Sequence, residues 1–302
     1  MFLISPRQGE PKVDWNRNEI AVRPRRGWRP NTAYTITMLP GISDLRGNVR
    51  NTGVVTVFST GATIPAGRIT GRLFDWMEAR PMPRALVQAN PVADTSLVYL
   101  TTTDTAGAFI VGSLPPGEYR VRGIIDANNN RALDPREAWD SSIVQLTDSS
   151  AVELLAFVRD SIGTRLQTIN YRDSVTLELL FDNPLSTTQP LAAGNIRVRG
   201  SDSVDVPIAS LSPPPPDTTI AATRRPSRPS PVRTQILKLG RRLTPGMVYR
   251  VSVSGAANLI GVVRSSDRTV TVPTAPAVPA APATAPPATP PPPPAPRPPS
   301  GL

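Results

Sequence analysis

Hydrophobic and polar residues alternate with a period of two along most of this sequence. The segments 34–38, 175–181 and 249–253 each place an apolar residue at every second position, and clusters of Gly, Pro, Asn and Asp separate such segments. This pattern is typical of antiparallel strands that bury one face. The one helix candidate, 151–158 (AVELLAFV), has no capping box and no polar stripe at helical spacing, so a strand is predicted there. The pattern therefore predicts an all-β fold.

Two parts of the chain, about 215 residues apart, repeat the same order of residues. Pro30–Thr37 aligns with Pro245–Ser252, and Gly41–Gly47 aligns with Gly255–Gly261. Each copy contains a turn, an alternating strand and a second turn built on Asp or Asn and Gly. A spacing this long is far above solenoid periods. It predicts two similar domains on either side of a different one.

The repeated residues resemble the bacterial Ig-like domain of S-layer proteins and surface lipoproteins. The resemblance rests on the "P-x-T-x-Y" strand entry, the "G-I-x-D-x-x-G-N" turn at Gly41–Asn48 and the closing Phe58–Gly61. In the second copy, Val175–Leu185 looks like the early "F-x-x-P-L" strand of that family, and the first copy has no such strand before it. Residues 1–61 are therefore expected to be a partial Ig-like domain without its N-terminal half, because Met1 is a misplaced start or the chain is a fragment.

The segment 62–158 has different motifs. Thr103–Phe109 supplies an Asx residue and a glycine, which predicts a tight hairpin followed by the entry of Phe109 into the core. Leu114–Gly117 is a rigid turn before a strand that starts at Tyr119. With the opening segment 67–73, these motifs are similar to the carboxypeptidase regulatory-like (prealbumin-like) β-sandwich. That resemblance implies a non-catalytic accessory or stalk module.

Proline divides the remainder of the chain. Of the 37 prolines, fourteen lie in 273–302 and seven in 213–231. The predicted organisation is a partial Ig-like domain (1–61), a prealbumin-like sandwich (62–158), an Ig-like domain (159–272) with a proline-rich loop at 212–231, and a disordered Pro/Ala-rich tail (273–302). The tail cannot bury a core and is expected to be an extended polyproline II spacer.

The missing residue types exclude several kinds of chemistry. The chain has no histidine and no cysteine, which excludes a Ser-His-Asp triad, a thiol nucleophile and a zinc–thiolate cluster. Its net charge of +10 comes almost entirely from arginine, but the arginines form no stripe interleaved with aromatic residues. Nucleic-acid binding is therefore not expected. The acidic pairs Asp202/Asp205 and Asp44/Asp75 are interpreted as turn residues rather than glycosidase carboxylates.

One segment has the spacing of a calcium site. In Asp126–Glu137, oxygen-bearing side chains stand at positions 1, 3, 5, 9 and 12, as in the twelve-residue EF-hand loop, in which position 7 contributes a backbone carbonyl. Arg131 stands at position 6, where glycine is usual, and three carboxylates give a formal charge of −3, so a weak Kd of about 10⁻⁴–10⁻³ M is expected. The alternative is a run of Asx turns without a metal. The predicted ligands are Asp126, Asn128, Asn130, Ala132, Asp134 and Glu137.

These observations predict a non-catalytic stalk or adhesion-type protein of the cell envelope or the extracellular space. Its expected partners are other envelope or surface proteins or polysaccharide. The N-terminus has no basic region ahead of its four apolar residues, so no secretory signal is predicted, and no apolar run approaches the ~20 residues that span a bilayer. A carbohydrate-binding accessory module is the alternative, with Trp76 and Trp139 as the stacking residues. An enzyme would have to rely on carboxylates alone.

Overall fold

The computed structural model describes residues 2–16, 19–44, 46–215 and 226–274. All regular structure in these ranges is strand, apart from one 3-10 turn, η1 (Ala193–Asn195). The all-β expectation is confirmed, and the former helix candidate lies on strand β15 (Ser149–Ala156). In the described ranges no helix has the length and hydrophobicity to cross a membrane. The predicted tail, from residue 275 onward, and residues 216–225 of the proline-rich loop lie outside the described residues.

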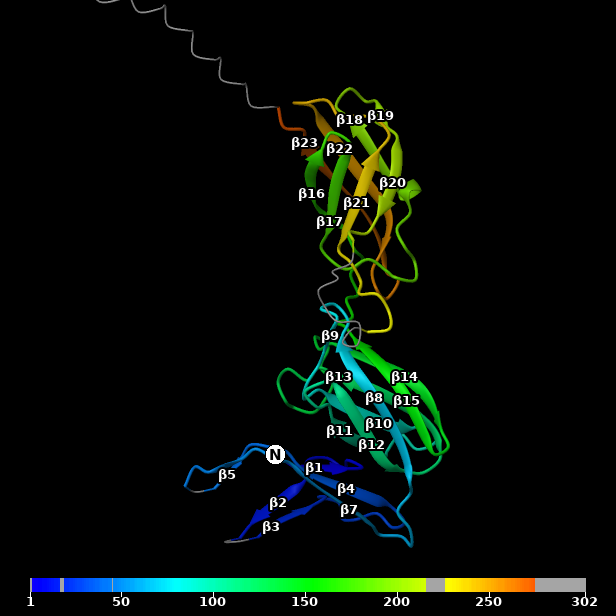
Figure 1. Ribbon diagram of the computed structural model, residues 1–302. Helices are drawn as coiled ribbons and strands as arrows, with labels where there is room; N and C mark the ends of the chain where they lie inside the picture. Colours follow the sequence, from blue (N-terminus) through cyan, green and yellow to red (C-terminus); the bar gives the residue numbers. More distant parts are fainter. Residues whose placement is uncertain (1, 17–18, 45, 216–225, 275–302) are drawn as a thin grey trace, which may run out of the picture.

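The strands form three groups along the chain, which we name the first (residues 2–61), second (67–157) and third (160–272) modules. The second and third modules lie end to end, and the strands of the first lie across the opposite end of the second (Figure 1). Each of the second and third modules is a sandwich of two four-stranded sheets. The first module contains one three-stranded sheet and two short hairpins.

The first module has the strand order β1-β4-β7 in its sheet, and the hairpins β2-β3 and β5-β6 lie outside it. Its strands are β1 (Phe2–Ser5), β2 (Lys12–Trp15), β3 (Ile20–Arg23), β4 (Ala33–Met38), β5 (Ile42–Ser43), β6 (Val49–Arg50) and β7 (Val54–Ser59).

The second module pairs the sheets β11-β10-β13-β14 and β12-β8-β15, and β9 adds to the edge of β8. Its strands are β8 (Gly67–Asp75), β9 (Arg80–Pro81), β10 (Leu86–Pro91), β11 (Tyr99–Thr102), β12 (Ala108–Leu114), β13 (Gly117–Ile124), β14 (Trp139–Leu146) and β15. β15 runs parallel to β8, with Leu154 opposite Leu73, and both residues are fully buried.

The structure corrects the expectation of a hairpin at residues 103–109. Asp104 does make the Asx turn, since its Oδ1 accepts the N–H groups of Ala106 and Ala108 at 2.8 Å each, and Gly107 has φ +71°. However, β11 and β12 on its two sides belong to different sheets. The turn is therefore a corner between the two layers, and Phe109 enters the core from it, 3% exposed.

The third module pairs the sheets β16-β17-β21-β20 and β19-β18-β22-β23. Leu177, Leu179 and Phe181, which alternate along β17, are all buried. Its strands are β16 (Leu166–Asp173), β17 (Thr176–Phe181), β18 (Ile196–Gly200), β19 (Asp205–Val206), β20 (Ile208–Ser212), β21 (Thr234–Leu239), β22 (Val248–Ala257) and β23 (Val263–Thr271).

The internal repeat extends to individual hydrogen bonds. The hydroxyl of Tyr34 accepts the backbone N–H of Arg29 at 2.8 Å, and the hydroxyl of Tyr249 accepts that of Thr244 at 3.0 Å, each from five residues earlier. Tyr34 and Tyr249 are both buried, on β4 and β22. The same contact at the same place shows that the repeated sequence produces the same corner twice.

The second turn of the repeat is also the same in both copies. The Oδ1 atom of Asp44 accepts the N–H groups of Arg46 and Asn48. In the same way, the Oδ1 atom of Asn258 accepts the N–H groups of Ile260 and Val262. The closing glycines both have positive φ, +82° for Gly47 and +86° for Gly261. The sheet β1-β4-β7 of the first module therefore corresponds to β18-β22-β23 of the third.

Candidate functional site

The candidate calcium loop, residues 126–137, connects the antiparallel strands β13 and β14 of the second module. The register pairs Ile124 with Trp139, so both ends of the loop are held a strand spacing apart. Asp126 organises the first half: its Oδ1 accepts the backbone N–H of Asn130 at 3.1 Å, and its Oδ2 accepts that of Arg131 at 2.8 Å. The first half of the loop is thus wound around its first carboxylate.

Arg131 takes the backbone conformation that a glycine normally supplies at this position. Its φ is +59°, in the left-handed region, where a residue with a side chain costs roughly 1–2 kcal/mol. The departure from the calcium-loop pattern noted in the sequence therefore does not change the path of the backbone. It raises the free-energy cost of that backbone conformation.

Glu137 closes the loop from its last position. Its side chain is buried (7% exposed), and its two oxygens reach opposite parts of the loop. Oε1 accepts the N–H of Ala127 at 3.1 Å, and Oε2 accepts that of Asp134 at 3.0 Å. A carboxylate has about four lone-pair sites, so these two bonds leave further acceptor capacity on both oxygens.

The remaining predicted ligands are hydrogen-bonded to one another. The amide nitrogens of Asn128 and Asn130 both donate to Oδ2 of Asp134, at 2.6 and 2.9 Å. Their carbonyl oxygens accept the N–H groups of Asn130 and Ala132, at 3.0 and 2.8 Å. In the described residues no three acidic side chains form a cluster that could hold a metal ion. Arg131 has the positive φ that glycine supplies at position 6 of a calcium loop, whereas the side-chain ends form the Asx turns of the alternative.

These contacts define what calcium binding would require of the chain. The side-chain amides of Asn128 and Asn130 donate to the carboxylate of Asp134, the group that would attract a cation. In this arrangement the amide groups occupy the place of the cation. For calcium to be held, Asn128 and Asn130 would have to turn their oxygens inward, and Asp126, Asp134 and Glu137 would supply the charge. Oxygen ligands of this kind suit calcium, which accepts six to eight of them and tolerates neutral amides.

The loop also contacts the first module, which the sequence did not predict. The guanidinium of Arg131 donates to the carbonyl of Phe2 at 3.0 Å and lies 3.5 Å from a carboxylate oxygen of Glu10. In return, Arg7 donates to the carbonyl of Arg131 and pairs with Glu10 at 3.0 Å. Arg131, which has a positive φ within the loop, is therefore also one of the residues that hold the first module. We call these four residues the first joint.

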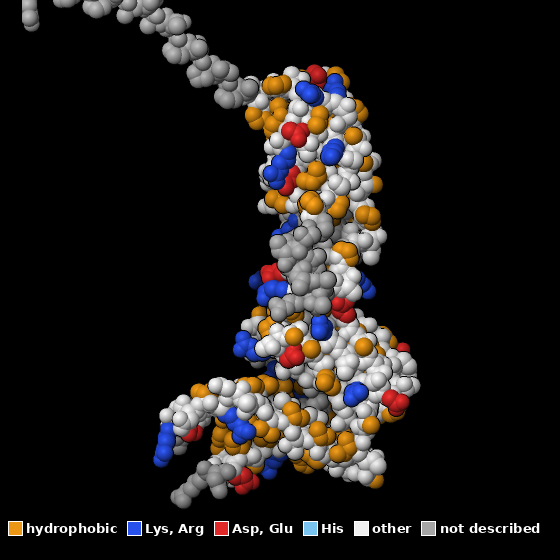
Figure 2. Space-filling model, in the orientation of Figure 1, with side chains coloured by type: hydrophobic (Ala, Val, Ile, Leu, Met, Phe, Trp, Pro, Cys, Tyr) orange, Lys and Arg blue, Asp and Glu red, His pale blue; other side chains and the backbone are white. Residues whose placement is uncertain are grey.

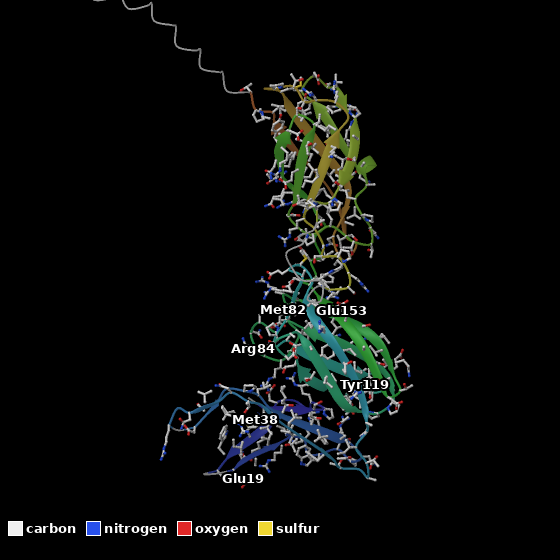
Figure 3. The ribbon with its side chains drawn as sticks, viewed as in Figure 1. Glu19, Met38, Met82, Arg84, Tyr119 and Glu153 are labelled. Atoms are coloured by element: carbon white, nitrogen blue, oxygen red, sulfur yellow. The ribbon has the colours of Figure 1, made fainter. Side chains whose placement is uncertain are left out.

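A second joint links the second and third modules. The indole N–H of Trp76 donates to the carbonyl of Pro229 at 3.1 Å, and the carboxylate of Glu153 accepts the N–H and hydroxyl of Ser227. The carboxylate end of Glu153 lies at the end of the second module that faces the third (Figure 3). Leu259 of the third module packs on the cluster of Phe74, Trp76, Leu155 and Phe157. The described part of the proline-rich loop thus bridges two modules.

The two tryptophans of the carbohydrate alternative already contact other side chains of the protein. Trp76 is 6% exposed and lies 5.6 Å from the ring of Phe157, centroid to centroid. The guanidinium of Arg159 lies 3.4 Å from the ring centroid of Trp139, and that of Arg122 lies 5.2 Å away. Burial lowers the pKa of Arg159. Trp76 is thus part of the second joint and cannot stack on a sugar as placed, and Arg159 covers one face of the Trp139 ring.

In the pair Asp202/Asp205, Asp202 is a turn residue as expected, whereas Asp205 lies on strand β19 and forms ion pairs. Asp202 accepts the N–H of Val204 at 3.0 Å, and Asp205 pairs with Arg197 and Arg199 at 2.6 and 2.8 Å. The hydrogen bonds from the two arginines hold the pKa of Asp205 well below its ordinary value. A carboxylate held in this way is a poor proton donor, which agrees with the interpretation from sequence.

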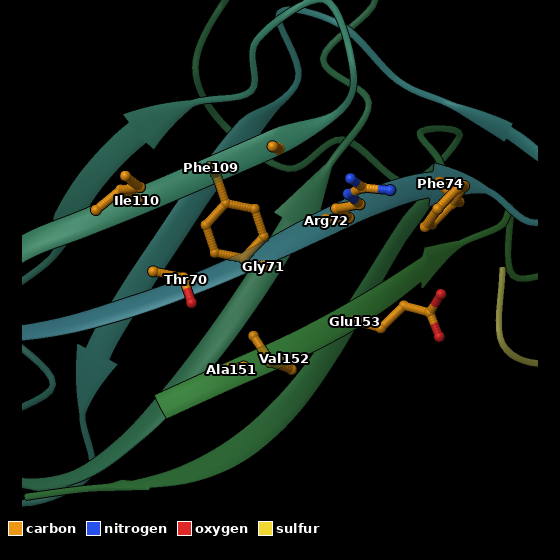
Figure 4. A pocket seen from close by; sticks show the side chains of 10 residues that line it. Thr70, Gly71, Arg72, Phe74, Phe109, Ile110, Ala151, Val152 and Glu153 are labelled. Carbon is orange, nitrogen blue, oxygen red and sulfur yellow. The ribbon is translucent and has the colours of Figure 1, made fainter. Parts of the chain in front are cut away.

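Two hollows lie among the described residues. One, of about 580 Å³, is a shallow depression on the outer side of β8, β12 and β15, where Gly71 and Thr70 lie beside Ala151 and Ile110 (Figure 4). The other, of about 360 Å³, lies at the second joint between Phe157, Arg159 and Leu259. Neither gathers a nucleophile with a base, so the geometry offers no catalytic arrangement at either hollow.

No protein-family model and no curated protein matches the chain. Solved structures resemble parts of it. The N-terminal part of the bacterial S-layer protein SbsC is 14% identical with a TM-score of 0.26, over 37% of this chain and 24% of that one. A putative carbohydrate binding protein from Bacteroides uniformis is 10% identical with a TM-score of 0.22, over 69% of this chain and 100% of that one.

A third similar structure is the BSP domain of a biofilm associated protein, 11% identical with a TM-score of 0.21, over 87% of this chain and 46% of that one. The chain thus spans about a quarter of the S-layer fragment and under half of the biofilm domain. At these TM-scores the likeness assigns no function to this chain.

Proposed function

We propose that this chain is a non-catalytic stalk or scaffold whose β modules are held in fixed relative positions by side-chain contacts at two joints. The observation that carries the proposal is the chemistry of those joints. Each uses hydrogen bonds from a loop of one module to the backbone or side chains of another, and the second adds a buried tryptophan. A protein that bears load or sets a distance needs such joints, whereas freely linked domains do not.

The modules are proposed to be two bacterial Ig-like domains, the first of them partial, around a carboxypeptidase regulatory-like sandwich. Supporting this, the first and third modules share their corners and turns, and the second has a different strand order. Such modules suit a protein of the cell envelope or the extracellular space, with other surface proteins or polysaccharide as partners. Fractionation of the source cells, followed by detection of the chain with an antibody, tests this location.

Calcium is proposed to bind the loop 126–137 and to stiffen the first joint. Supporting this, Arg131 at position 6 has the positive φ that glycine supplies in such loops, and the same loop carries Arg131 to Phe2 and Glu10. A cation would fix the loop, and a fixed loop holds the arginine in place. The alternative, an Asx-turn loop that needs no metal, predicts no response to calcium.

Calcium at 10 mM is expected to stabilise the second module by about 1.4 kcal/mol if Kd is about 1 mM, since the gain is RT ln(1 + [Ca²⁺]/Kd). This corresponds to a rise of several degrees in the melting temperature. Glu137→Gln and Asp126→Asn are expected to abolish the rise. The exposed residues Glu118 and Asp148 of the same module provide the controls, Glu118→Gln and Asp148→Asn, which are expected to keep it. The absence of any rise in the unmodified chain would refute the calcium proposal.

Two substitutions of Arg131 separate its two roles. Arg131→Gly and Arg131→Ala both remove the contacts with Phe2 and Glu10, so both should increase protease cleavage in the connection 60–66 severalfold. Only glycine relieves the left-handed strain, so Arg131→Gly should be more stable to denaturant than Arg131→Ala by roughly 1–2 kcal/mol. Equal free energies of unfolding for the two variants would show that the left-handed conformation carries no cost at this position.

A further inference from the structure

The cavity of about 360 Å³ at the second joint takes its walls from two modules. The second module contributes Arg136, from the loop 126–137, and Phe157, which follows β15. The third contributes Leu259 and Arg233, which directly precedes β21, and Arg159 lies in the connection between the modules. Figure 2 shows basic side chains on the surface beside the junction of these modules. Ligand sites of this size are common at domain boundaries, where apolar walls carry a few charged groups.

The charged groups that line the cavity are unbalanced. They are the guanidinium groups of Arg136, Arg159 and Arg233 and the carboxylate of Asp160. That carboxylate already accepts hydrogen bonds from neutral donors: its Oδ1 from the N–H of Ile162 and its Oδ2 from the side-chain amide of Asn183, both at 2.8 Å. Among the described residues it forms no ion pair. The cavity thus has an excess of positive charge that its own carboxylate does not pair with.

Two of these arginines, Arg136 and Arg233, have no partner in the described part of the chain. Both residues are exposed, and the side chain of neither forms a hydrogen bond or an ion pair with another described residue. The backbone at each position is nevertheless fixed. The carbonyl of Arg233 accepts the N–H of Phe181 at 2.8 Å, and Arg136 precedes Glu137, which is buried. Both guanidinium groups are therefore held at the cavity with their donors free for a ligand.

The third arginine, Arg159, carries a charge that the protein compensates only in part. Its guanidinium lies 3.4 Å from the ring centroid of Trp139 and 4.6 Å from that of Phe157. Its one ion pair among the described residues, with Asp140, is 3.8 Å long. Burial lowers the pKa of Arg159, and the nearby charge of Arg122 lowers it further. An anion in the cavity would favour the charged form of this group.

The remaining wall of the cavity is largely apolar. Phe157 and Leu259 belong to one packed cluster at this joint, and Ile260, next to Leu259, is 43% exposed. An apolar group gains free energy by covering such a surface, whereas a hydrated inorganic ion does not. The wall therefore favours an anion that carries an organic body.

We propose that this cavity binds an organic carboxylate, whose carboxyl group pairs with Arg136 and Arg233 and whose apolar part lies against Phe157 and Leu259. A guanidinium group pairs with a carboxylate through two parallel hydrogen bonds. Because one of the two arginines belongs to each module, a bound carboxylate links the modules across the second joint. The proposal goes beyond the stalk role. None of the predicted calcium ligands lines the cavity, so binding does not depend on calcium.

The test uses the full chain with a calcium chelator, sodium benzoate as the probe, and sodium chloride adjusted to keep the ionic strength constant. The side-chain Nε–H signals of Arg136 and Arg233 are followed by NMR spectroscopy and are expected to shift along the same saturating curve. Arg136→Gln and Arg233→Gln are each expected to weaken binding by about fivefold, measured on the remaining arginine, because each removes one charged partner. The control is Arg241→Gln, at an exposed arginine of the third module that does not line the cavity, and it is expected to leave binding unchanged.

Two further probes separate the charge of the ligand from its apolar part. Benzamide has the same ring without the charge and is expected not to shift the arginine signals. Acetate carries the charge on a methyl group only, so it is expected to bind about tenfold more weakly than benzoate. Acetate or inorganic phosphate bound as tightly as benzoate would overturn the proposal. So would equal effects of Arg241→Gln and Arg136→Gln, because the anions would then form only a diffuse atmosphere around basic side chains.

A measurement on the unmodified chain covers the case in which a substitution alters the joint. The indole N–H of Trp76 donates to the carbonyl of Pro229, so its signal reports whether each variant keeps the second joint. In the unmodified chain, nuclear Overhauser effects are expected between the ring protons of bound benzoate and the side chains of Phe157 and Leu259. Their absence at saturating benzoate would overturn the proposal, whatever the variants show.

Discussion

Trp76→Ala is expected to lower the free energy of unfolding of the second module by about 3–5 kcal/mol, the largest single-residue effect at the second joint. The side chain is 6% exposed, packs on Phe157, and donates to the carbonyl of Pro229 from the third module. Its removal would leave a cavity and an unpaired carbonyl together. Denaturant unfolding followed by circular dichroism measures the loss.

Two controls make the Trp76 experiment specific. Trp76→Phe keeps most of the packing and loses only the hydrogen bond, so a cost of about 1 kcal/mol is expected. Trp15→Ala removes a tryptophan that is 56% exposed, so a clearly smaller loss than that of Trp76→Ala is expected. If Trp76→Ala cost no more than Trp15→Ala, the indole would not be part of a packed joint.

Gly71→Ala is expected to destabilise the second module by about 3 kcal/mol or more, at the upper end of overpacking effects. A Cβ atom at this position would lie 2.0 Å from the carbonyl oxygen of Val152 and 2.6 Å from Cζ of Phe109. The first clash is with the backbone of the neighbouring parallel strand β15, which cannot move without losing its pairing with β8.

Gly112→Ala is the matched control for Gly71→Ala. Gly112 lies on β12 of the same sheet, and a Cβ atom there would have nothing within 4 Å. A small effect is expected, and a slight stabilisation would agree with the lower chain entropy of alanine. Thermal melting of the two variants side by side measures the difference. Equal melting temperatures would contradict the close approach of β8 and β15.

The features set by local chemistry could be predicted from the sequence. Alternation located the strands, and the repeat identified corresponding corners, which the hydroxyl contacts of Tyr34 and Tyr249 confirm. The turn at Asp104 was also correct, but the hairpin was wrong, because a turn sequence does not determine whether the next strand stays in the same sheet. The parallel pairing of β15 with β8, some eighty residues away, has no local signal either.

In the candidate site, too, the local features could be predicted from the sequence and the contacts between distant residues could not. Its oxygen-bearing residues could be identified from spacing alone, and the calcium role remains a prediction. The sequence did not predict that Arg131 keeps the left-handed conformation. Nor did it predict that the Arg131 side chain contacts Phe2 and Glu10. These contacts join residues more than 120 positions apart and exist only once two modules have docked. The Trp76–Pro229 contact that forms the second joint is of the same kind.

The modules are proposed to form a stalk whose first joint calcium stiffens. Small-angle X-ray scattering of the full chain, recorded with 10 mM calcium and with chelator, tests it most directly. An elongated particle is expected in both conditions, with a narrower distribution of intramolecular distances when calcium is present. Glu137→Gln is expected to remove this difference. A compact particle, or distance distributions identical with and without calcium, would contradict it.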